Sequence, residues 1–308
     1  MNYSLLILLF IISLLIIIRI NCFNKSNKDN FIIDDETNTI NEFTENFKNK
    51  FHNIYKTPTK NYVDINIPYD SNYQNKTVYR VWCSKDPSAY CGGRVGEKFP
   101  LEHTMKNLPG WNQVILGNKE KDEFMYKYFG KDHIITKAYF MINPKFQVAR
   151  GDLLRYLILY VHGGLYIDFK SCVTKPLPDI PMNKDLVIRT WYAQRHIFTQ
   201  GEIINWFAYG KRGSPIIKDI INQIVDNILH YKERQYLKSI TNISTSQPKR
   251  IILATTGPIA VSIAILRSKH RNKVEYNNKL YNMIQYNCNK NKGIDINHYS
   301  QINEELVI

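Results

Sequence analysis

The sequence contains no pair of cysteines at the CxxC spacing that structural zinc sites use, although it has five cysteines. They are Cys22, Cys83, Cys91, Cys172 and Cys288. The spacing therefore argues against a zinc-stabilised fold. Cys83 and Cys91 are close enough in the sequence to close a disulfide loop in an oxidising compartment, and they can equally be free thiols in a reducing one.

The chain also lacks an arginine-rich arm, a zinc finger, an RNP-like aromatic motif and any visible internal repeat. Its formal net charge is nevertheless +14 and its pI is about 9.4. Because the basic residues are scattered rather than gathered in a tract, we expect no nucleic-acid partner. The positive field fits phosphorylated small molecules and anionic lipid headgroups.

An apolar run covers residues 5–18, interrupted only by Ser13, and it ends at Arg19. The run is short for a membrane span, which takes about 20 residues, and it overlaps the length of a signal-peptide core. No basic segment precedes it, and no small-residue cleavage site follows it, so we favour an uncleaved transmembrane anchor over residues 1–21. Since Arg19, Lys25 and Lys28 all follow the run, the positive-inside rule places the body on the cytosolic side.

Residues 22–76 are rich in Asn, Lys, Thr, Asp and Glu and show little hydrophobic periodicity. This composition is typical of a flexible polar stem. We therefore expect three parts: an anchor over 1–21, a stem over 22–76 and a folded domain over 77–308. The predicted location is a membrane, with a single N-terminal pass.

Within residues 77–308, apolar segments of strand length alternate with segments of helical periodicity. Strands are predicted at 78–83, 111–116, 165–167, 186–191 and 203–209, and helices at 119–129, 149–162, 215–229 and 258–267. Ser214 followed by Pro215 is a typical helix start. The alternation predicts an α/β fold with a largely parallel sheet.

The stretch 149–168 organises this domain. Asp152 and Arg155 lie three positions apart on its apolar helix and therefore share a face. The pair Gly163–Gly164 suits a helix C-terminus that must turn left-handed. Asp168 follows a short apolar strand, at the strand end where α/β sheets bind ligands.

Residues 150–168, which read RGDLLRYLILYVHGGLYID, resemble the sugar-binding region of DXD-containing glycosyltransferases, closest to glycosyltransferase family 32 with its fungal α-1,6-mannosyltransferases. Similar segments are 81–82, 205–210 and 256–258, so that the resemblance covers roughly residues 77–300. It implies a GT-A fold, which is a Rossmann-like nucleotide-sugar-binding domain. It also implies that residues 77–308 are a catalytic domain with a GDP- or UDP-sugar donor, Mn²⁺ or Mg²⁺, and retention of the anomeric configuration. The location that it implies is a membrane of the Golgi or endoplasmic reticulum type, or a host internal membrane.

The resemblance assigns roles to individual residues. Trp82 would stack on the nucleotide base, Asp152 and Arg155 would bind the donor sugar and diphosphate, and Asp168 would contact ribose and metal. Alternatives remain open: Trp82 can be a core residue, and Asp152 and Arg155 can form a surface ion pair. The expected donor-binding residues are Trp82, Asp152, Arg155, Gly163, Gly164, Tyr166, Asp168 and Lys170, with Asp152, Arg155 and Asp168 catalytic.

The sequence departs from the family at Asp168-Phe169-Lys170, where a lysine replaces the second acid of the DXD motif. Three outcomes are open. The metal can be held by Asp168 with another ligand, for which His298 is the candidate. Lys170 can instead neutralise the charge of the leaving diphosphate. Catalysis can also be lost.

The leading hypothesis is a retaining glycosyltransferase that moves mannose, galactose, glucose or N-acetylglucosamine to a glycan or glycoconjugate acceptor. The alternative is a catalytically inactive nucleotide-sugar- or glycan-binding protein, suggested by Lys170. A basic membrane-surface or nucleic-acid-binding protein, suggested only by the net charge, is the third hypothesis.

Overall fold

A computed structural model gives the architecture of the protein. The structure describes residues 58, 60–72, 74–82, 98–181, 183–191, 202–233, 247–276, 282–286, 288, 302 and 304–308. The chain divides into two units, residues 1–49 and 50–308, and all described residues belong to the second. The anchor predicted over 1–21 and the first part of the predicted stem lie outside the described residues.

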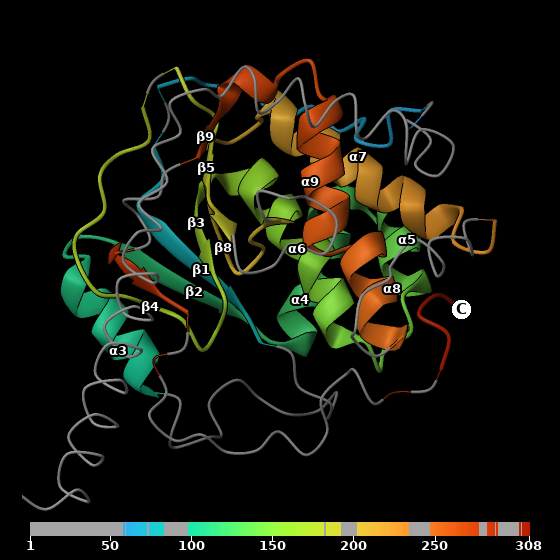
Figure 1. Ribbon diagram of the computed structural model, residues 1–308, viewed down its shortest axis with the longest axis horizontal. Helices are drawn as coiled ribbons and strands as arrows, with labels where there is room; N and C mark the ends of the chain where they lie inside the picture. Colours follow the sequence, from blue (N-terminus) through green and yellow to red (C-terminus); the bar gives the residue numbers. More distant parts are fainter. Residues whose placement is uncertain are drawn as a thin grey trace, which may run out of the picture. The chain divides into compact units, whose positions relative to one another are not determined.

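The largest sheet among the described residues has six strands in the order β2-β1-β3-β8-β5-β9 (Figure 1). Their bounds are β1 Thr77–Val81, β2 Asn112–Leu116, β3 Gly164–Ile167, β5 Leu186–Ile188, β8 Phe207–Gly210 and β9 Val274–Tyr276. Strand β8 runs antiparallel to its neighbours β3 and β5, and the other pairs are parallel. The prediction of an α/β fold with a largely parallel sheet is confirmed.

Helices lie on both faces of the sheet, most of them on one (Figure 1). Helix α3 (Lys98–Asn107) packs against β4 (Cys172–Val173), which pairs with β10 (Ile284–Gln285). The remaining helices are α4 (Asn118–Phe129), α5 (Ile134–Met141), α6 (Gln147–His162), α7 (Pro215–Leu229), α8 (Gln247–Thr255) and α9 (Pro258–Arg267). A short 3₁₀ helix, Arg271–Lys273, precedes β9.

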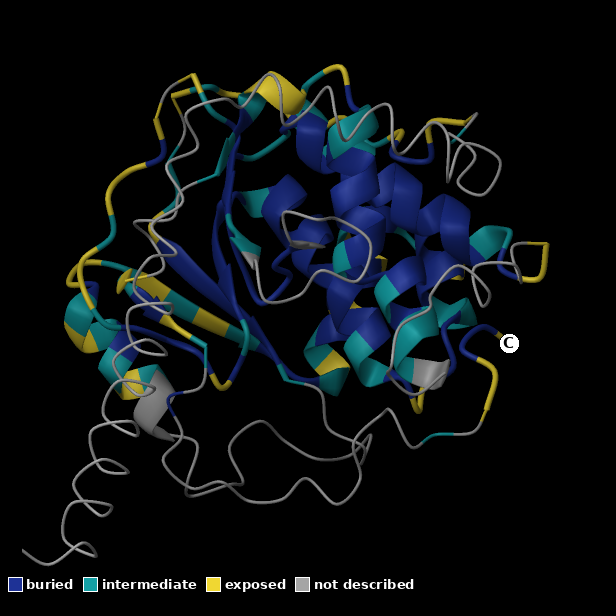
Figure 2. Cartoon of the chain, viewed as in Figure 1, coloured by how far each residue is buried: buried dark blue, intermediate teal, exposed yellow. Residues whose placement is uncertain are grey.

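Successive side chains along a strand point to opposite faces of the sheet, so that a hydrophobic core forms on each face. In β3, Tyr166 packs into the core shared with the larger helix layer, while Leu165 and Ile167 pack into the core on the α3 side. Helix α6 is buried from Ala149 to Val161, as the dark ribbon in Figure 2 shows. A helix buried on all sides needs apolar residues all round, which explains the run of apolar and aromatic residues 156–161.

Two predicted strands are each divided in the structure. The segment 186–191 forms β5 and then β6 (Thr190–Trp191), and the segment 203–209 forms β7 (Glu202–Ile203) and then β8. Strands β6 and β7 pair with each other in a separate ribbon. The chain leaves the main sheet between the two parts, where the amide of Ile204 donates to the carbonyl of Arg189 at 2.8 Å. Apolar patterning cannot reveal such a change of partner, because both parts are apolar.

Residues 60–72 and 74–76, which the sequence analysis assigned to the flexible stem, pack on the domain instead. Val63 is fully buried, and the Tyr62 hydroxyl donates to Asp226 at 2.7 Å. The amides of Tyr62 and Val63 both donate to the Asn222 side chain. Nearer the sheet, the Tyr69 hydroxyl donates to buried Asp185 at 2.8 Å. The stem boundary at residue 76 is therefore corrected: this arm is polar because its backbone and side chains bond to polar groups of the domain.

Among the described residues, one stretch, Lys249–Arg267, is long and apolar enough to cross a membrane. It comprises most of α8 and all of α9, with a break at Gly257, and 72% of its apolar window is buried inside the protein. Since α9 packs against α7 and α8, its apolar residues belong to the core.

Candidate donor-binding site

Asp152 is buried near the start of α6 and is the centre of a hydrogen-bond network. Its Oδ1 accepts from Arg155 Nη2 at 2.7 Å and from Asn205 Nδ2 at 2.9 Å, and its Oδ2 accepts from the Thr256 hydroxyl at 3.1 Å. Tyr156 donates in turn to Asn205 Oδ1 at 2.7 Å. Burial raises the pKa of Asp152 to about 7, against the opposing effects of Arg155 and the hydrogen bonds.

Arg155 connects Asp152 to the end of β3. Its guanidinium lies 4.7 Å from the centre of the Tyr166 ring and 3.7 Å, measured from Nη1, from Asp168 Oδ1. Burial acts to lower the pKa of Arg155, but Tyr166, Asp152 and Asp168 outweigh it and raise the pKa. The pair of Asp152 and Arg155 is therefore a buried ion pair inside the domain, and the surface-pair alternative is wrong.

Asp168 follows β3 directly, at its carboxyl end. Its side chain is 28% exposed and accepts from the Tyr166 hydroxyl at 3.2 Å, and its amide donates to the Trp206 carbonyl. Burial raises the pKa of the carboxyl group, while Arg155, Lys170 and Arg80 lower it. The structure thus brings Asp152, Arg155, Tyr166 and Asp168 together at the carboxyl end of β3, where α/β folds bind ligands.

A buried arginine, which the sequence analysis did not select, holds the turn that carries Asp168. Arg80 Nη1 donates to the carbonyls of Asp168 at 3.0 Å, Phe169 at 3.1 Å and Ser171 at 2.7 Å, while Nη2 donates to Thr104 at 2.7 Å. Burial lowers the pKa of Arg80 to about 9, so that it remains charged at neutral pH. In the sequence, Arg80 stands out only as the one charged residue of the segment that forms β1. In the structure, every residue of β1 is buried.

Trp82 lies just after β1 and is only partly buried, unlike a core tryptophan. Its ring makes an edge contact with Phe169, with ring centres 4.5 Å apart. The ammonium group of buried Lys121 donates to the Trp82 carbonyl at 3.1 Å. Trp82 and the Asp168 turn therefore lie side by side.

The two predicted glycines lie elsewhere. Gly163 ends α6 and Gly164 begins β3, at the opposite end of the strand from Asp168. Their φ angles are +68° and +95°, and a Cβ on Gly164 would lie 2.7 Å from the Thr77 carbonyl oxygen. The glycine pair thus permits the turn between α6 and β3 and the close approach of β1. It does not lie with the other residues predicted to bind the nucleotide-sugar donor.

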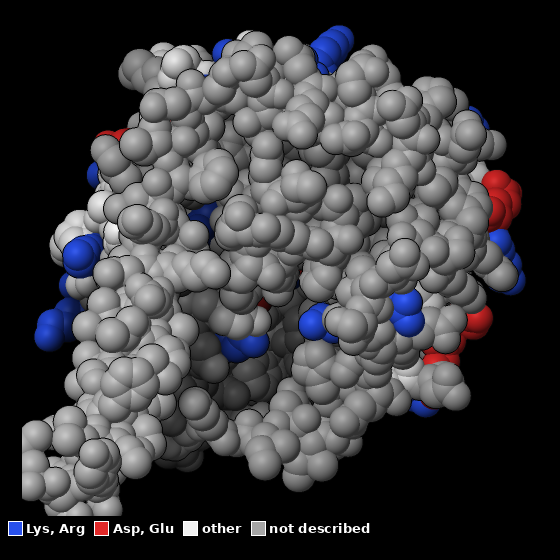
Figure 3. Space-filling model, in the orientation of Figure 1, with Lys and Arg blue, Asp and Glu red and all other residues white. Residues whose placement is uncertain are grey.

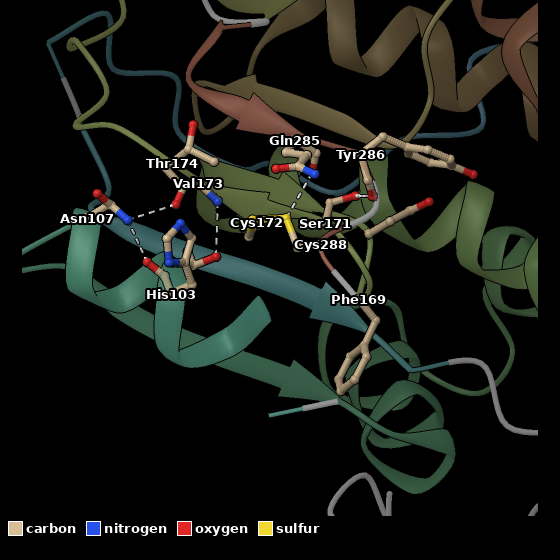
Figure 4. Close-up of a disulfide and its surroundings, with 12 residues drawn as sticks. His103, Asn107, Phe169, Ser171, Cys172, Val173, Thr174, Gln285, Tyr286 and Cys288 are labelled. Atoms are coloured by element: carbon tan, nitrogen blue, oxygen red, sulfur yellow. Dashed lines mark hydrogen bonds between the residues drawn. A yellow bond between two sulfur atoms is a disulfide. The ribbon is translucent and has the colours of Figure 1, made fainter. Parts of the chain in front are cut away.

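Lys170 is exposed, and its ammonium nitrogen lies 4.4 Å from the centre of the Tyr286 ring. Its carbonyl accepts from the Cys288 amide at 2.9 Å, and Cys288 forms a disulfide with Cys172 (Figure 4). Composition alone did not indicate this pairing, because the cysteines are separated by 116 positions. Cys83 and Cys91, the pair considered from the sequence, lie outside the described residues.

Among the described residues, the side chains around Asp168 do not fit the Mn²⁺ or Mg²⁺ that the resemblance implies. Such cations take several oxygen ligands. Within the described ranges, no group of three or more His, Cys, Asp or Glu residues could hold a metal ion. Asp168 instead has Arg155, Lys170 and Arg80 as charged neighbours. His298, the predicted second ligand, lies outside the described residues.

Some of the positive charge of the described residues is visible at the surface. Figure 3 shows Lys and Arg side chains of the described residues at several separate places on the visible face.

Asn205 and Thr256 are functional candidates that the sequence analysis did not name singly. They lie 53 and 104 positions from Asp152 in the sequence, yet both bond to its carboxylate. Both belong to the segments 205–210 and 256–258 that carried the family resemblance. That resemblance was the signal, but only the fold reveals that the two segments meet at Asp152.

Comparison with known proteins gives consistent matches. Residues 96–187 match the family described as glycosyltransferase sugar-binding region containing DXD motif. The initiation-specific α-1,6-mannosyltransferase of Candida albicans is 26% identical over 153 residues, which cover 43% of this chain and 38% of that protein. The enzyme of the same name from Saccharomyces cerevisiae is 22% identical, over 59% of this chain and 45% of that protein.

The chain thus spans less than half the length of these two relatives. A solved structure named PaToxG glycosyltransferase superposes with a TM-score of 0.43 and 18% identity, over 75% of this chain and 79% of that one. The resemblance predicted from the sequence is confirmed: the segment that carries Asp152, Arg155 and Asp168 matches the sugar-binding region of the DXD-containing glycosyltransferases, and the matches support an enzyme of that class.

Proposed function

We propose that this protein is a retaining glycosyltransferase of the GT-A type. It moves a hexose from a nucleotide-diphosphate sugar to a glycan or glycoconjugate acceptor. The observation that carries the proposal is the convergence of Asp152, Arg155 and Asp168 at the carboxyl end of β3, within the matched sugar-binding region. The names of the relatives make mannose the first hexose to test, with GDP-mannose as donor.

The proposed site assigns each end of the donor to a different element. Trp82 offers a partly exposed ring for the base, and the guanidinium of Arg155, which bonds to Asp152 and lies beside Asp168, offers positive charge to the diphosphate. Asp168, with its side chain 28% exposed, can accept from ribose or sugar hydroxyls. Asp152 is buried, and it keeps Arg155 oriented through the 2.7 Å ion pair.

Retention requires the acceptor to attack the face of the sugar that the diphosphate leaves. The C1–O bond breaks with both electrons going to the β-phosphate oxygen, and the acceptor oxygen forms the new bond to C1. The acceptor proton then passes to the departing phosphate oxygen. This path needs no protein nucleophile, and we assign none. The contribution of the protein is to orient the donor and to stabilise the charge of the leaving diphosphate.

A catalytically inactive nucleotide-sugar-binding protein is the second candidate, and the observation that favours it is the lysine at position 170. Both candidates bind the donor, but only the enzyme cleaves it. Slow hydrolysis of the donor in the absence of an acceptor therefore separates them.

We also propose a membrane-bound protein with the N-terminal apolar run as its anchor and the domain on the luminal side. The disulfide between Cys172 and Cys288 supports the lumen, because disulfides persist in oxidising compartments. The flanking positive charges favour the opposite orientation. Protection of the domain from added protease in sealed membranes would support the luminal side, and digestion would contradict it.

The proposal is tested by release of nucleoside diphosphate from GDP-mannose, UDP-galactose, UDP-glucose and UDP-N-acetylglucosamine, measured by chromatography. We expect one donor to be hydrolysed and the Asp168→Asn variant to lose at least about 100-fold in rate. Asp132→Asn, at an exposed position far along the chain from the site residues, is the matched control and keeps the wild-type rate. Binding of a donor without hydrolysis would favour the inactive binding protein.

A further inference from the structure

The turn that follows β3 is held rigidly from both sides. On the α3 side, Arg80 donates to the carbonyls of Asp168, Phe169 and Ser171. The turn is closed internally by the Ser171 amide, which donates to the Asp168 carbonyl at 2.9 Å. Three backbone oxygens of the turn are therefore already engaged with a buried cation, which leaves them poor ligands for a metal.

The C-terminal part of the domain holds the other side of this turn (Figure 4). The Ser171 hydroxyl donates to the Tyr286 carbonyl at 2.6 Å, and the Cys288 amide donates to the Lys170 carbonyl at 2.9 Å. The disulfide between Cys172 and Cys288 fixes this pairing covalently. Two hydrogen bonds and the disulfide thus join residues 170–172 to residues 286 and 288. These three links fix the backbone of Lys170 in place.

The Lys170 side chain is placed as well as its backbone. Its ammonium group lies over the Tyr286 ring at 4.4 Å, a cation–π arrangement that keeps an exposed lysine near one position. An ammonium group has three N–H donors, and in such a contact those on the side away from the ring stay available for a ligand. The ammonium is therefore positioned and still able to donate to a ligand.

Positive charge exceeds negative charge around Asp168, as in a site that binds anions. Arg155 Nη1 lies 3.7 Å from Asp168 Oδ1, and Lys170 and Arg80 act on the same carboxylate. A divalent cation at this point would meet the carboxylate of Asp168, with that of Asp152 behind Arg155, against three cationic side chains, and the excess of positive charge would repel it. A diphosphate, which carries the opposite charge, would be attracted by the same groups.

From these observations we infer that Lys170, together with Arg155, binds the diphosphate of the donor in place of a divalent cation, so that donor binding needs no metal. The inference rests on the proposed function and concerns how the same site holds its donor. When the C1–O bond breaks, its electron pair goes to the β-phosphate oxygen, and the N–H groups of Lys170 and Arg155 donate to the charge that develops there.

The test is the affinity of the full chain for GDP and for UDP, measured by calorimetry in EDTA and again with Mn²⁺. We expect the affinity of the wild type for the nucleotide it prefers to differ by no more than about 3-fold between the two conditions. Lys170→Ala should weaken binding roughly 10- to 100-fold in both, the usual effect of losing a charge-assisted hydrogen bond. Lys175→Ala, a change at a nearby exposed lysine, is the matched control and keeps the wild-type affinity.

A second variant, Lys170→Asp, restores the two-acid spacing and should bind the nucleotide only when Mn²⁺ is present. Because Lys170 is exposed, both variants should keep the wild-type melting temperature. Wild-type binding that requires Mn²⁺ would overturn the inference and leave the proposed function standing. Lys170→Ala binding as tightly as the Lys175→Ala control would also overturn it. Failure of both nucleotides to bind under either condition would overturn the inference and the proposed function together.

Discussion

Asp152 is the residue at which three distant parts of the chain meet. Arg155 on its own helix, Asn205 before β8 and Thr256 before α9 all donate to its two oxygens. A buried carboxylate with three donors is held in one orientation, and it holds its donors in turn. The orientation of Arg155 toward the end of β3 therefore depends on the ionised form of Asp152.

This dependence predicts an acid limb in the pH profile of donor hydrolysis. Burial raises the pKa of Asp152 to about 7, so that the carboxylate, and with it the ion pair to Arg155, is lost as the pH falls through neutrality. The Thr256 hydrogen bond favours the ionised form. Thr256→Val should therefore move the acid limb to higher pH, by roughly half a unit or more, as expected for the loss of one such bond.

The matched control for this substitution is Thr255→Val. Thr255 is adjacent in the sequence and equally buried, but the hydrogen bond to Asp152 comes from Thr256. The measurement is the rate of donor hydrolysis between pH 5 and pH 9, in steps fine enough to resolve a shift of about half a unit. A limb that stays in place in Thr256→Val, or that moves equally in both variants, would contradict the assignment.

At the scale of single residues, spacing on one helix correctly predicted Asp152 and Arg155 as neighbours, because this is a local property. The grouping of Asp168 with them came from the family resemblance, and the structure confirms that the three lie together. The sequence missed Arg80, whose three bonds to the Asp168 turn bridge 88 to 91 positions in the sequence. Contacts at that separation depend on which strands are adjacent, and the order β1-β3 is not contained in the periodicity of either strand.

At the scale of elements, the junction of α6 and β3 is constrained by its backbone. Gly163 and Gly164 both have positive φ, and the backbone of β1 passes close to Gly164. The sequence indicated the turn through its glycine pair, and it predicted most helices and strands because their apolar runs are long. It assigned these glycines to the donor site, whereas they lie at the other end of β3.

Gly164→Ala should therefore destabilise the protein more than an alanine at another left-handed glycine. A Cβ at Gly164, where φ is +95°, would lie 2.7 Å from a backbone oxygen, whereas one at Gly110, where φ is +79°, would meet no atom within 4 Å. We expect Gly110→Ala to lower the free energy of unfolding by about 1 kcal/mol and Gly164→Ala by about 3 kcal/mol. Urea unfolding measures both, and equal losses would show that close packing at Gly164 does not matter.

At the scale of the whole domain, the disulfide links the centre of the chain to its C-terminal part. Cys172 and Cys288 are 116 positions apart in the sequence, and β4, which contains Cys172, pairs with β10, which shortly precedes Cys288. Closing a loop of this length restricts the unfolded chain, and a cross-link of this kind contributes about 2–4 kcal/mol. The sequence could not predict the pairing, since five cysteines without a recognisable spacing allow several.

Reduction should accordingly lower the free energy of unfolding by about 2–4 kcal/mol. Urea unfolding with and without dithiothreitol measures the difference. The double variant Cys172→Ser, Cys288→Ser is the control, because its stability should not respond to the reductant. A wild type equally stable in both conditions would contradict a stabilising role for this disulfide.

Transfer of a sugar with retention of configuration is tested by the anomeric form of the first product. The wild type is incubated with the donor that it hydrolyses, and proton NMR follows the first product formed before mutarotation. We expect a product sugar with the same anomeric configuration as the donor. A first product of the opposite configuration would contradict retention, and no release of sugar from any of the donors would contradict the enzyme itself.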